Sequence, residues 1–243
     1  MRFDLFNLFR CIFCGAKSQP DFDICVACEA QLPWMANIKH CQICSIDLPE
    51  ASTESSCGNC LSKPPYFNQV HAALVYRQEA AFLLQKLKFQ HQLIHSKIAG
   101  KLLVQALNGQ AKPEILIPVP LHWHRQIQRG FNQSLEIARF VSKELNVPIN
   151  NKLIKRHLAT AAQSESTSKA RLGNVSNAFT VKTKSVPKHV AIVDDVLTTG
   201  STVNAMAKKL KAAGVQTIEI WCVARTLLST DIFTSSFFEE TGH

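Results

Sequence analysis

Two adjacent carboxylates followed by a cluster of small hydroxyl-bearing residues form the stretch of sequence best suited to chemistry. Asp194 and Asp195 come directly after the short apolar run 189–193. Carboxylates accept hydrogen bonds from sugar hydroxyls and help to hold Mg²⁺, whereas hydroxyls and backbone N–H groups at the start of a helix bind phosphate. The stretch therefore predicts a site for a ligand that joins a phosphate to a diol. The second part of the stretch, hereafter the TTGST loop, consists of Thr198, Thr199, Gly200, Ser201 and Thr202.

A strand and a helix are predicted on either side of the TTGST loop. Residues 189–193 form a short β-branched run without a helical period, and residues 201–213 are amphipathic. The loop would then lie at the carboxyl end of a parallel strand, where open α/β sheets bind ligands. Gly200 would permit a close approach or a positive φ. A P-loop is excluded because no lysine follows Gly200, and a dinucleotide fingerprint is excluded because the loop has a single glycine.

The order of apolar strand, paired acids and T-T-G-x-T resembles the motif with which type I phosphoribosyltransferases bind phosphoribosyl pyrophosphate (PRPP). The resemblance implies that Asp194 and Asp195 are catalytic residues that hold the ribose hydroxyls. It also implies that the TTGST loop holds the 5′-phosphate and that Mg²⁺ accompanies PRPP. The alternative is a surface turn that is rich in small polar residues.

Eight of the nine cysteines stand in four C-x-x-C pairs within the first sixty residues. Such a pair presents two thiolates to one tetrahedral metal, and two pairs complete a site. Nothing in the sequence indicates secretion, which argues against disulfides, and a redox C-x-x-C would be expected singly. We therefore predict two structural Zn²⁺ ions, with the pairs combined either sequentially or as an interleaved cross-brace. The predicted ligands are Cys11, Cys14, Cys25, Cys28, Cys41, Cys44, Cys57 and Cys60.

Two arginines follow another predicted strand, residues 115–119, which ends in the sequence IPVP. Arg125 and Arg129 lie in the loop 121–130, before a helix predicted from Asn132 to Leu145. If this strand lies beside 189–193, both guanidinium groups face the same ligand, where bidentate arginines suit a pyrophosphate. The segment also resembles the P-V-P…R…R-G-F-N-Q segment of the ComF competence family. Members of that family join a cysteine-rich zinc domain to a phosphoribosyltransferase fold.

A long polar segment, residues 158–173, has no apolar period and is rich in serine, threonine and alanine. Loops of this length are usually functional or disordered. Type I phosphoribosyltransferases have a mobile catalytic loop at this place in the chain. The resemblance therefore implies that Gln163 and Arg171 belong to a lid that excludes water from the reacting sugar. The alternative is a flexible linker.

Further strands are predicted at 68–77, 152–156 and 216–224, and further helices at 80–89 and 96–107. The fold class is therefore α/β, with a doubly wound, mostly parallel sheet of type I phosphoribosyltransferase type, preceded by a small cysteine-rich double zinc ribbon. The stiff sequence Lys63-Pro64-Pro65 marks the boundary. We expect a double zinc ribbon at 1–63, a phosphoribosyltransferase-like domain at 66–229 and a frayed tail at 230–243.

Charge and hydropathy narrow the possible partners. No window approaches the roughly 20 apolar residues that cross a bilayer, so we expect a cytoplasmic protein with no membrane span. Residues 1–65 carry five basic and seven acidic residues, a net charge of −2, whereas residues 66–243 carry twenty-two and eleven, a net charge of +11. The basic excess suits a polyanionic ligand or nucleic acid, although a scattered excess is also an ordinary soluble surface.

The resemblance to the ComF family implies PRPP–Mg²⁺ binding and a role in DNA uptake, competence or the use of external DNA. Single-stranded DNA and other competence proteins are the partners that it implies. Two rival functions remain open. One is a zinc-dependent single-stranded nucleic-acid-binding protein with a non-catalytic phosphoribosyltransferase fold, and the other is a nucleobase salvage enzyme. The sequence does not decide whether the protein turns over a substrate.

Overall fold

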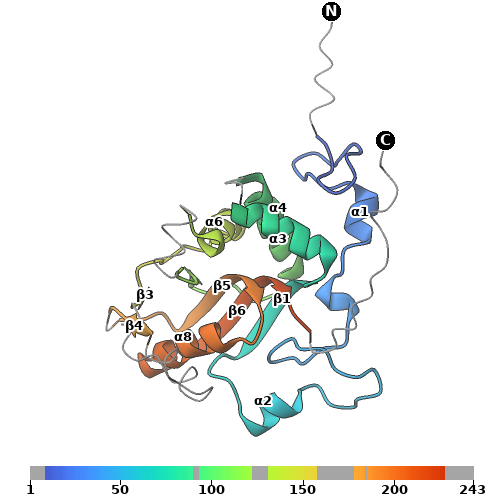
Figure 1. Ribbon diagram of the computed structural model, residues 1–243. Coiled ribbons are helices and arrows are strands. Elements are labelled where there is room, and N and C mark those ends of the chain that lie inside the picture. Colours follow the sequence, from blue (N-terminus) through green and yellow to red (C-terminus); the bar gives the residue numbers. More distant parts are fainter. Residues whose placement is uncertain (1–8, 90–92, 122–130, 158–177, 184, 228–243) are drawn as a thin grey trace, which may run out of the picture.

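A parallel four-stranded sheet lies at the centre of the part of the chain that the structure describes (Figure 1). The structure is a computed structural model, and it describes residues 9–89, 93–121, 131–157, 178–183 and 185–227. The strand order is β1-β6-β5-β2, and each neighbouring pair is parallel. The strands are β1 (Gln69–Val75), β2 (Ile115–Pro118), β5 (His189–Leu197) and β6 (Thr217–Arg225).

Helices cover both faces of this sheet. On one face, Leu102 and Ile137 pack in the same buried cluster as Trp221 of β6. On the other face, Met206 packs in a second cluster with Ile220. Apolar strands that are buried on both faces explain the near-continuous hydrophobic runs in β5 and β6. The helices of the first face are α3 (Gln78–Phe89), α4 (Leu93–Ala106) and α6 (Gln133–Leu145), and α8 (Ser201–Ala212) covers the second face (Figure 1).

Local signals in the sequence set the ends of helix α6 and its distance from α4. The Asn132 side chain caps the start of α6 by accepting a hydrogen bond from Leu135 N at 3.3 Å. Asn146 ends the helix in the left-handed conformation, with φ 54°. Gly100 of α4 lets the two helices approach closely, because a Cβ atom at this position would lie 2.7 Å from Phe140 Cδ1.

The strand order creates a topological switch point between β2 and β5. The chain leaves β2 towards α6 on one face of the sheet, and it leaves β5 towards α8 on the other face. The carboxyl ends of two such strands bound a crevice in which ligands of open α/β sheets bind. The condition set for the two arginines, that strand 115–119 lies beside the strand that carries Asp194, is met, since Ile117 pairs in register with Ile192.

A small antiparallel hairpin stands apart from the main sheet. It consists of β3 (Ile154–Arg156) and β4 (Phe179–Val181), with Arg156 opposite Phe179. Ile154 and Phe179 are buried in the cluster on the α8 face. We did not predict β4, because three residues are too few to show an alternating pattern.

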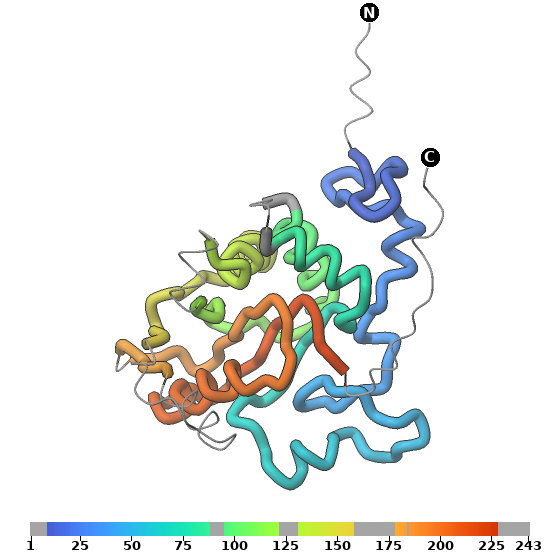
Figure 2. The backbone as a smooth tube through the Cα atoms, in the orientation of Figure 1, coloured from blue at the N-terminus to red at the C-terminus, as the bar shows by residue number. Residues whose placement is uncertain are grey.

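The cysteine-rich segment runs along the β1 edge of the sheet, as the blue part of the tube in Figure 2 shows. Val75 N donates a hydrogen bond to Pro33 O at 2.8 Å, and Trp34 forms an antiparallel bridge with Leu74. Met35 is buried in the cluster on the α8 face. The segment therefore packs onto the sheet between its two groups of cysteines. Its short helices are α1 (Val26–Ala30), η2 (Met35–Asn37) and α2 (Gly58–Ser62).

Strand β5 is longer than the sequence predicted. We expected the strand to end at Val193, but it continues to Leu197, and Asp194 pairs in register with Cys222 of β6. The reason is that backbone pairing with the long neighbour β6 continues through the two polar residues. No helix among the described residues is both long and apolar enough to cross a bilayer.

Candidate functional site

The TTGST loop lies where the sequence predicted it, between the end of β5 and the start of α8. Gly200 precedes the first residue of α8 with φ 73°, a left-handed conformation that glycine adopts without strain. The N-cap residue Gly200 has no side chain that could cap α8, and the first turn of α8 contains no acidic residue. The unpaired N–H groups and the helix dipole at such an end attract an anion.

The hydroxyls of the TTGST loop are available at its surface. Thr198, Thr199 and Ser201 are exposed. Thr199 Oγ1 donates a hydrogen bond to Ser201 Oγ at 3.1 Å and accepts one from Ser201 N at 3.3 Å. These two hydroxyls therefore stand side by side at the start of α8, where they suit a phosphate group.

The acidic pair has two different environments. Asp194 Oδ1 accepts hydrogen bonds from Ser134 Oγ at 3.0 Å and from Asp195 N at 2.9 Å. Asp195 Oδ1 accepts a hydrogen bond from Val196 N at 2.8 Å. Ser134 is in the first turn of α6, so this contact joins the helix that follows β2 to strand β5. Both acidic residues lie on the last part of β5, which ends at Leu197, directly before the TTGST loop.

Burial and the neighbouring Asp195 carboxylate raise the pKa of Asp194 well above its ordinary value. The hydrogen bonds from Asp195 N and Ser134 oppose this increase. A bound cation or the hydroxyls of a sugar would relieve the repulsion between the two carboxylates. The pair therefore suits the diol and Mg²⁺ that the sequence predicted.

Four predicted site residues lie outside the described residues. Arg125 and Arg129 fall in 122–130, and Gln163 and Arg171 fall in 158–177. The described residues that flank the first segment are well anchored, since Asn132 Nδ2 donates a hydrogen bond to Val119 O at 3.0 Å. This contact holds the residue that follows β2 against the start of α6.

The eight predicted metal ligands form two separate groups of four. Within each group, all four Sγ atoms lie within 4.8 Å of one another. The groups combine the C-x-x-C pairs sequentially, so the alternative of an interleaved cross-brace is wrong. The first group, hereafter ribbon 1, contains Cys11, Cys14, Cys25 and Cys28, and the second, ribbon 2, contains Cys41, Cys44, Cys57 and Cys60.

The geometry of both groups fits Zn²⁺. A tetrahedral site with Zn–S bonds of about 2.3 Å requires sulfur atoms about 3.8 Å apart, and the Cys14–Cys25 and Cys44–Cys57 Sγ distances are both 3.6 Å. Burial opposes ionisation of Cys11 and Cys41, but backbone N–H groups outweigh it and lower the pKa of each thiol to about 7. Four thiolates leave no open coordination position, so each ion would be structural.

Sequence reasoning missed one buried arginine next to the TTGST loop. Arg225 is the last residue of β6 and is only 5% exposed. Its guanidinium group donates hydrogen bonds to Leu197 O at 3.0 Å and to Cys44 O at 3.0 Å. The predicted strand 216–224 ended one residue before Arg225, and an arginine that follows an apolar strand has the same sequence signal as a solvated strand end.

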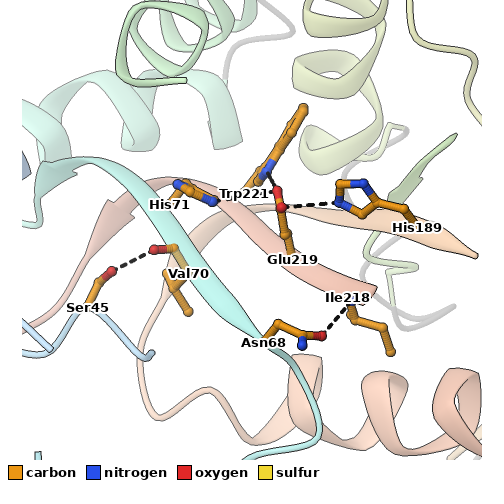
Figure 3. A network of polar contacts seen from close by, with 8 residues as sticks. All are labelled: Ser45, Asn68, Val70, His71, His189, Ile218, Glu219 and Trp221. Carbon is orange, nitrogen blue, oxygen red and sulfur yellow. Dashed lines mark hydrogen bonds and ion pairs between the residues drawn. The ribbon is translucent and has the colours of Figure 1, made fainter. Parts of the chain in front are cut away.

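A polar network at the opposite end of β6 was also missed (Figure 3). Glu219 accepts hydrogen bonds from Trp221 Nε1 at 2.8 Å and from His189 Nε2 at 3.1 Å, and His71 Nε2 lies 3.5 Å from it. Burial lowers the pKa of His71, and the Glu219 carboxylate opposes this effect. The network connects β1, β5 and β6 away from the TTGST loop, so it organises the sheet rather than the candidate site.

Comparison with known protein families identifies the class of protein to which this chain belongs. The Double zinc ribbon domain model matches residues 5–61, and the Phosphoribosyl transferase domain model matches residues 132–230. These matches cover the two cysteine groups and the TTGST loop. The fold and the site therefore define a phosphoribosyltransferase-fold protein that carries a double zinc ribbon.

Sequence identity to individual relatives shows the family within this class of protein. The chain is 34% identical to competence protein F of Haemophilus influenzae, over 91% of this chain and 99% of that protein. It is 32% identical to DNA utilization protein YhgH of Escherichia coli O157:H7, over 89% of this chain and 90% of that protein. It is also 26% identical to competence protein ComFC of Streptococcus pneumoniae, over 63% of this chain and 67% of that protein. The chain belongs to the competence protein F family, which confirms the resemblance read from the sequence.

Proposed function

We propose that this protein binds PRPP together with Mg²⁺ at the carboxyl ends of β2 and β5. The observation that carries the proposal is the position of the acidic pair near the end of β5. It is bonded to the first turn of α6 at the switch point of the sheet, and the TTGST loop and α8 follow it directly in the chain. The TTGST loop would hold the 5′-phosphate, and Asp194 and Asp195 would hold the ribose hydroxyls and support Mg²⁺. Arg125 and Arg129 would contact the pyrophosphate, and Gln163 and Arg171 would belong to the lid.

The metal and domain assignments form part of the same proposal. Each ribbon would hold one Zn²⁺ within residues 1–63, and the ligand would bind the α/β part at 66–229. When bound, Mg²⁺ would stabilise charge that develops on a departing pyrophosphate. The relatives named competence protein F and DNA utilization protein support a role in taking up or using external DNA.

Calorimetric titration of PRPP with and without Mg²⁺ tests the proposal. Binding should require Mg²⁺ for full affinity and should weaken in Asp195→Asn, which keeps the shape of the side chain but removes its charge. Inorganic phosphate should bind Asp195→Asn at least as well as the unchanged protein, because the TTGST loop holds phosphate without the carboxylates. Absence of PRPP binding to the unchanged protein would refute the proposal.

The arginine assignment has its own test. Arg125→Ala and Arg129→Ala should weaken PRPP binding more than ribose-5-phosphate binding, because only PRPP carries the pyrophosphate. The expected loss for PRPP is about 1–3 kcal/mol for each arginine. Equal losses for the two ligands would show that these side chains do not contact the pyrophosphate.

A second candidate function is binding of single-stranded nucleic acid, and one observation favours it. Lys155 of β3 and Lys182, the residue after β4, are both exposed, and the close approach of Lys155 lowers the pKa of Lys182. Crowded lysines of this kind neutralise phosphates and make binding strongly salt-dependent. Lys155→Gln combined with Lys182→Gln should then weaken binding of an oligonucleotide and reduce its salt dependence, without changing PRPP binding.

A further inference from the structure

Arg225 connects ribbon 2 directly to the TTGST loop. Its Nε donates to the backbone carbonyl of Cys44, a ribbon 2 ligand, at 3.0 Å. Its Nη1 donates to Leu197 O at 3.0 Å and also to Thr198 O, which belongs to the TTGST loop. Nη1 also donates to Thr226 O at 3.0 Å. One buried guanidinium group therefore holds the metal-binding segment and the loop in a fixed relation.

The same two segments face each other across a cleft of about 770 Å³. The TTGST loop lines one side, through residues such as Thr199 and Ser201, and ribbon 2 lines the other through Cys57, Gly58 and Asn59. Ribbon 2 therefore borders the surface on which the phosphate of a ligand would be bound.

Ribbon 1 has no such connection among the described residues. It packs on the helices of the opposite face, where the Phe13 and Phe82 ring centroids are 5.8 Å apart and Lys101 Nζ lies 4.7 Å from the Phe22 ring centroid. None of its cysteines lines the cleft. The two ribbons have the same ligand set and similar geometry, yet only one of them contacts the TTGST loop through a buried side chain.

The physical consequence follows from the way in which a metal stiffens its ligands. With a metal bound, Cys44 is fixed at its sulfur, so its carbonyl is a rigid acceptor for Arg225. Without a metal, the Cys44 segment loses this restraint, and Arg225 loses a fixed partner. Leu197 O would keep its hydrogen bond from Thr226 N, but the Thr198 carbonyl would no longer be held in place by Arg225. A loop that must be ordered on binding gives weaker affinity than one that is ordered beforehand.

We propose that Arg225 is a positioning residue through which the metal in ribbon 2, and not that in ribbon 1, controls ligand binding at the TTGST loop. Insofar as the ligand is a phosphorylated ribose, this inference rests on the proposed function. Its structural part, that ribbon 2 sets the order of the loop, is independent of the identity of the ligand.

The two ribbons supply a matched pair of variants. Cys25 and Cys57 occupy the same position in their ribbons, immediately before the short helices α1 and α2. Cys25→Ser and Cys57→Ser should each lose one metal ion per chain. In Cys57→Ser, PRPP affinity should fall about tenfold, and amide hydrogen exchange at residues 198–204 should become faster. In Cys25→Ser, PRPP affinity should stay within about twofold, and exchange at residues 198–204 should be unchanged.

Variants of Arg225 separate positioning from simple loss of stability. Arg225→Gln should retain both metal ions but show faster amide hydrogen exchange at residues 198–204 and weaker PRPP binding. Arg225→Lys should restore part of the slow exchange and part of the PRPP affinity. Adding Cys57→Ser to Arg225→Gln should cause little further loss, because the connection is already broken. Arg139→Gln is the control, since the Arg139 side chain is exposed and its ion pair, within the described part of the chain, is with Glu136 of the same helix.

The following results would overturn the proposed role of Arg225 or decide it by another variant. If Cys57→Ser and Cys25→Ser changed loop exchange equally, or if Arg225→Gln left it unchanged, the inference would be overturned. If Cys57→Ser did not fold, Arg225→Gln with both metals bound would decide it alone. If the unchanged protein did not bind PRPP, the proposed function would fail, but the exchange measurements would still decide whether ribbon 2 orders the loop.

Discussion

The Ser134 hydroxyl donates a hydrogen bond to Asp194 Oδ1 at 3.0 Å, which joins the first turn of α6 to the acidic pair on β5. The two residues are sixty positions apart in the sequence. The contact is made possible by the neighbouring positions of β2 and β5, because α6 follows one strand and the carboxylate lies on the other. Ser134 thereby favours the ionised form of a carboxyl group whose pKa is otherwise raised.

Removal of the Ser134 hydroxyl should weaken Mg²⁺–PRPP binding. Ser134→Ala deletes a hydrogen bond to a charged group, so we expect a loss of about 1–2 kcal/mol and a further increase in the pKa of Asp194. Calorimetric titrations at several pH values measure both effects. Ser142→Ala, on the same helix, is the control. If the affinity for Mg²⁺–PRPP depended on pH in the same way in Ser134→Ala and in the unchanged protein, the prediction would be contradicted.

Asp194→Asn should make the protein more stable while it weakens ligand binding. A carboxyl group with a raised pKa in the folded state costs stability as pH rises from its unfolded pKa to its folded pKa. Asparagine carries no charge, so the gain should be absent in acid and reach roughly 1 kcal/mol near neutral pH. Thermal unfolding across this pH range measures the gain. A variant that was less stable than the unchanged protein near neutral pH would contradict this account.

Gly200→Ala should damage the TTGST loop through backbone strain rather than through a clash. The nearest atom to an added Cβ would be Leu197 Cδ1 at 3.9 Å, so space is available, but φ is +73°. We expect a cost of about 1 kcal/mol and weaker binding of inorganic phosphate. Gly58→Ala is the matched control, because a Cβ there meets nothing within 4 Å. Equal phosphate affinity in both variants would show that the positive φ is unimportant.

Metal analysis of the protein purified without added zinc should give two Zn²⁺ ions per chain. Both thiolate groups have the spacing that a tetrahedral site requires. Chelation should lower the melting temperature, because metal binding contributes folding free energy to such small segments. The prediction fails if the native protein contains no zinc and eight cysteine thiols react freely.

His71 should make the fold sensitive to mild acid. Burial holds its pKa below 6.5 in the folded state, so the folded protein binds fewer protons than the unfolded chain as pH falls. The stability that depends on neutral His71 is complete above pH 6.5 and is lost as pH falls from there towards the folded pKa. His71→Gln should therefore show a smaller decrease in melting temperature between about pH 8 and pH 5.5. An unchanged decrease would assign the sensitivity to other groups, such as His95, whose pKa is also lowered by burial.

The sequence predicted the features that depend on local spacing. A C-x-x-C pair specifies a metal knuckle within four residues, so the two metal groups could be expected before their pairing was known. The strand, acidic pair and TTGST loop are likewise contiguous, and their place on the sheet follows from the rule for parallel strands. Asn132 was recognisable as the start of α6 because helix caps are local signals.

Arg225 could not be predicted in the same way. Its partner Cys44 is 181 positions away, and Leu197 is 28 positions away. No periodic pattern marks such a contact, because it depends on how the cysteine-rich segment folds back over the sheet. Glu219 was missed for a related reason, since its partners His71 and His189 come from two different strands. Contacts of this kind become visible only once the order of the strands is known.

The bridge between Trp34 and Leu74 has a consequence for the protein when it lacks metal. β1 is an outer strand of the sheet, and the backbone of residues 33–35 covers its free edge. This cover is held between ribbon 1 and ribbon 2. If both metals were lost, the cover would detach and leave an apolar strand with unpaired backbone groups, which is a template for pairing with other molecules. Loss of zinc would then favour aggregation of the protein through this exposed strand edge.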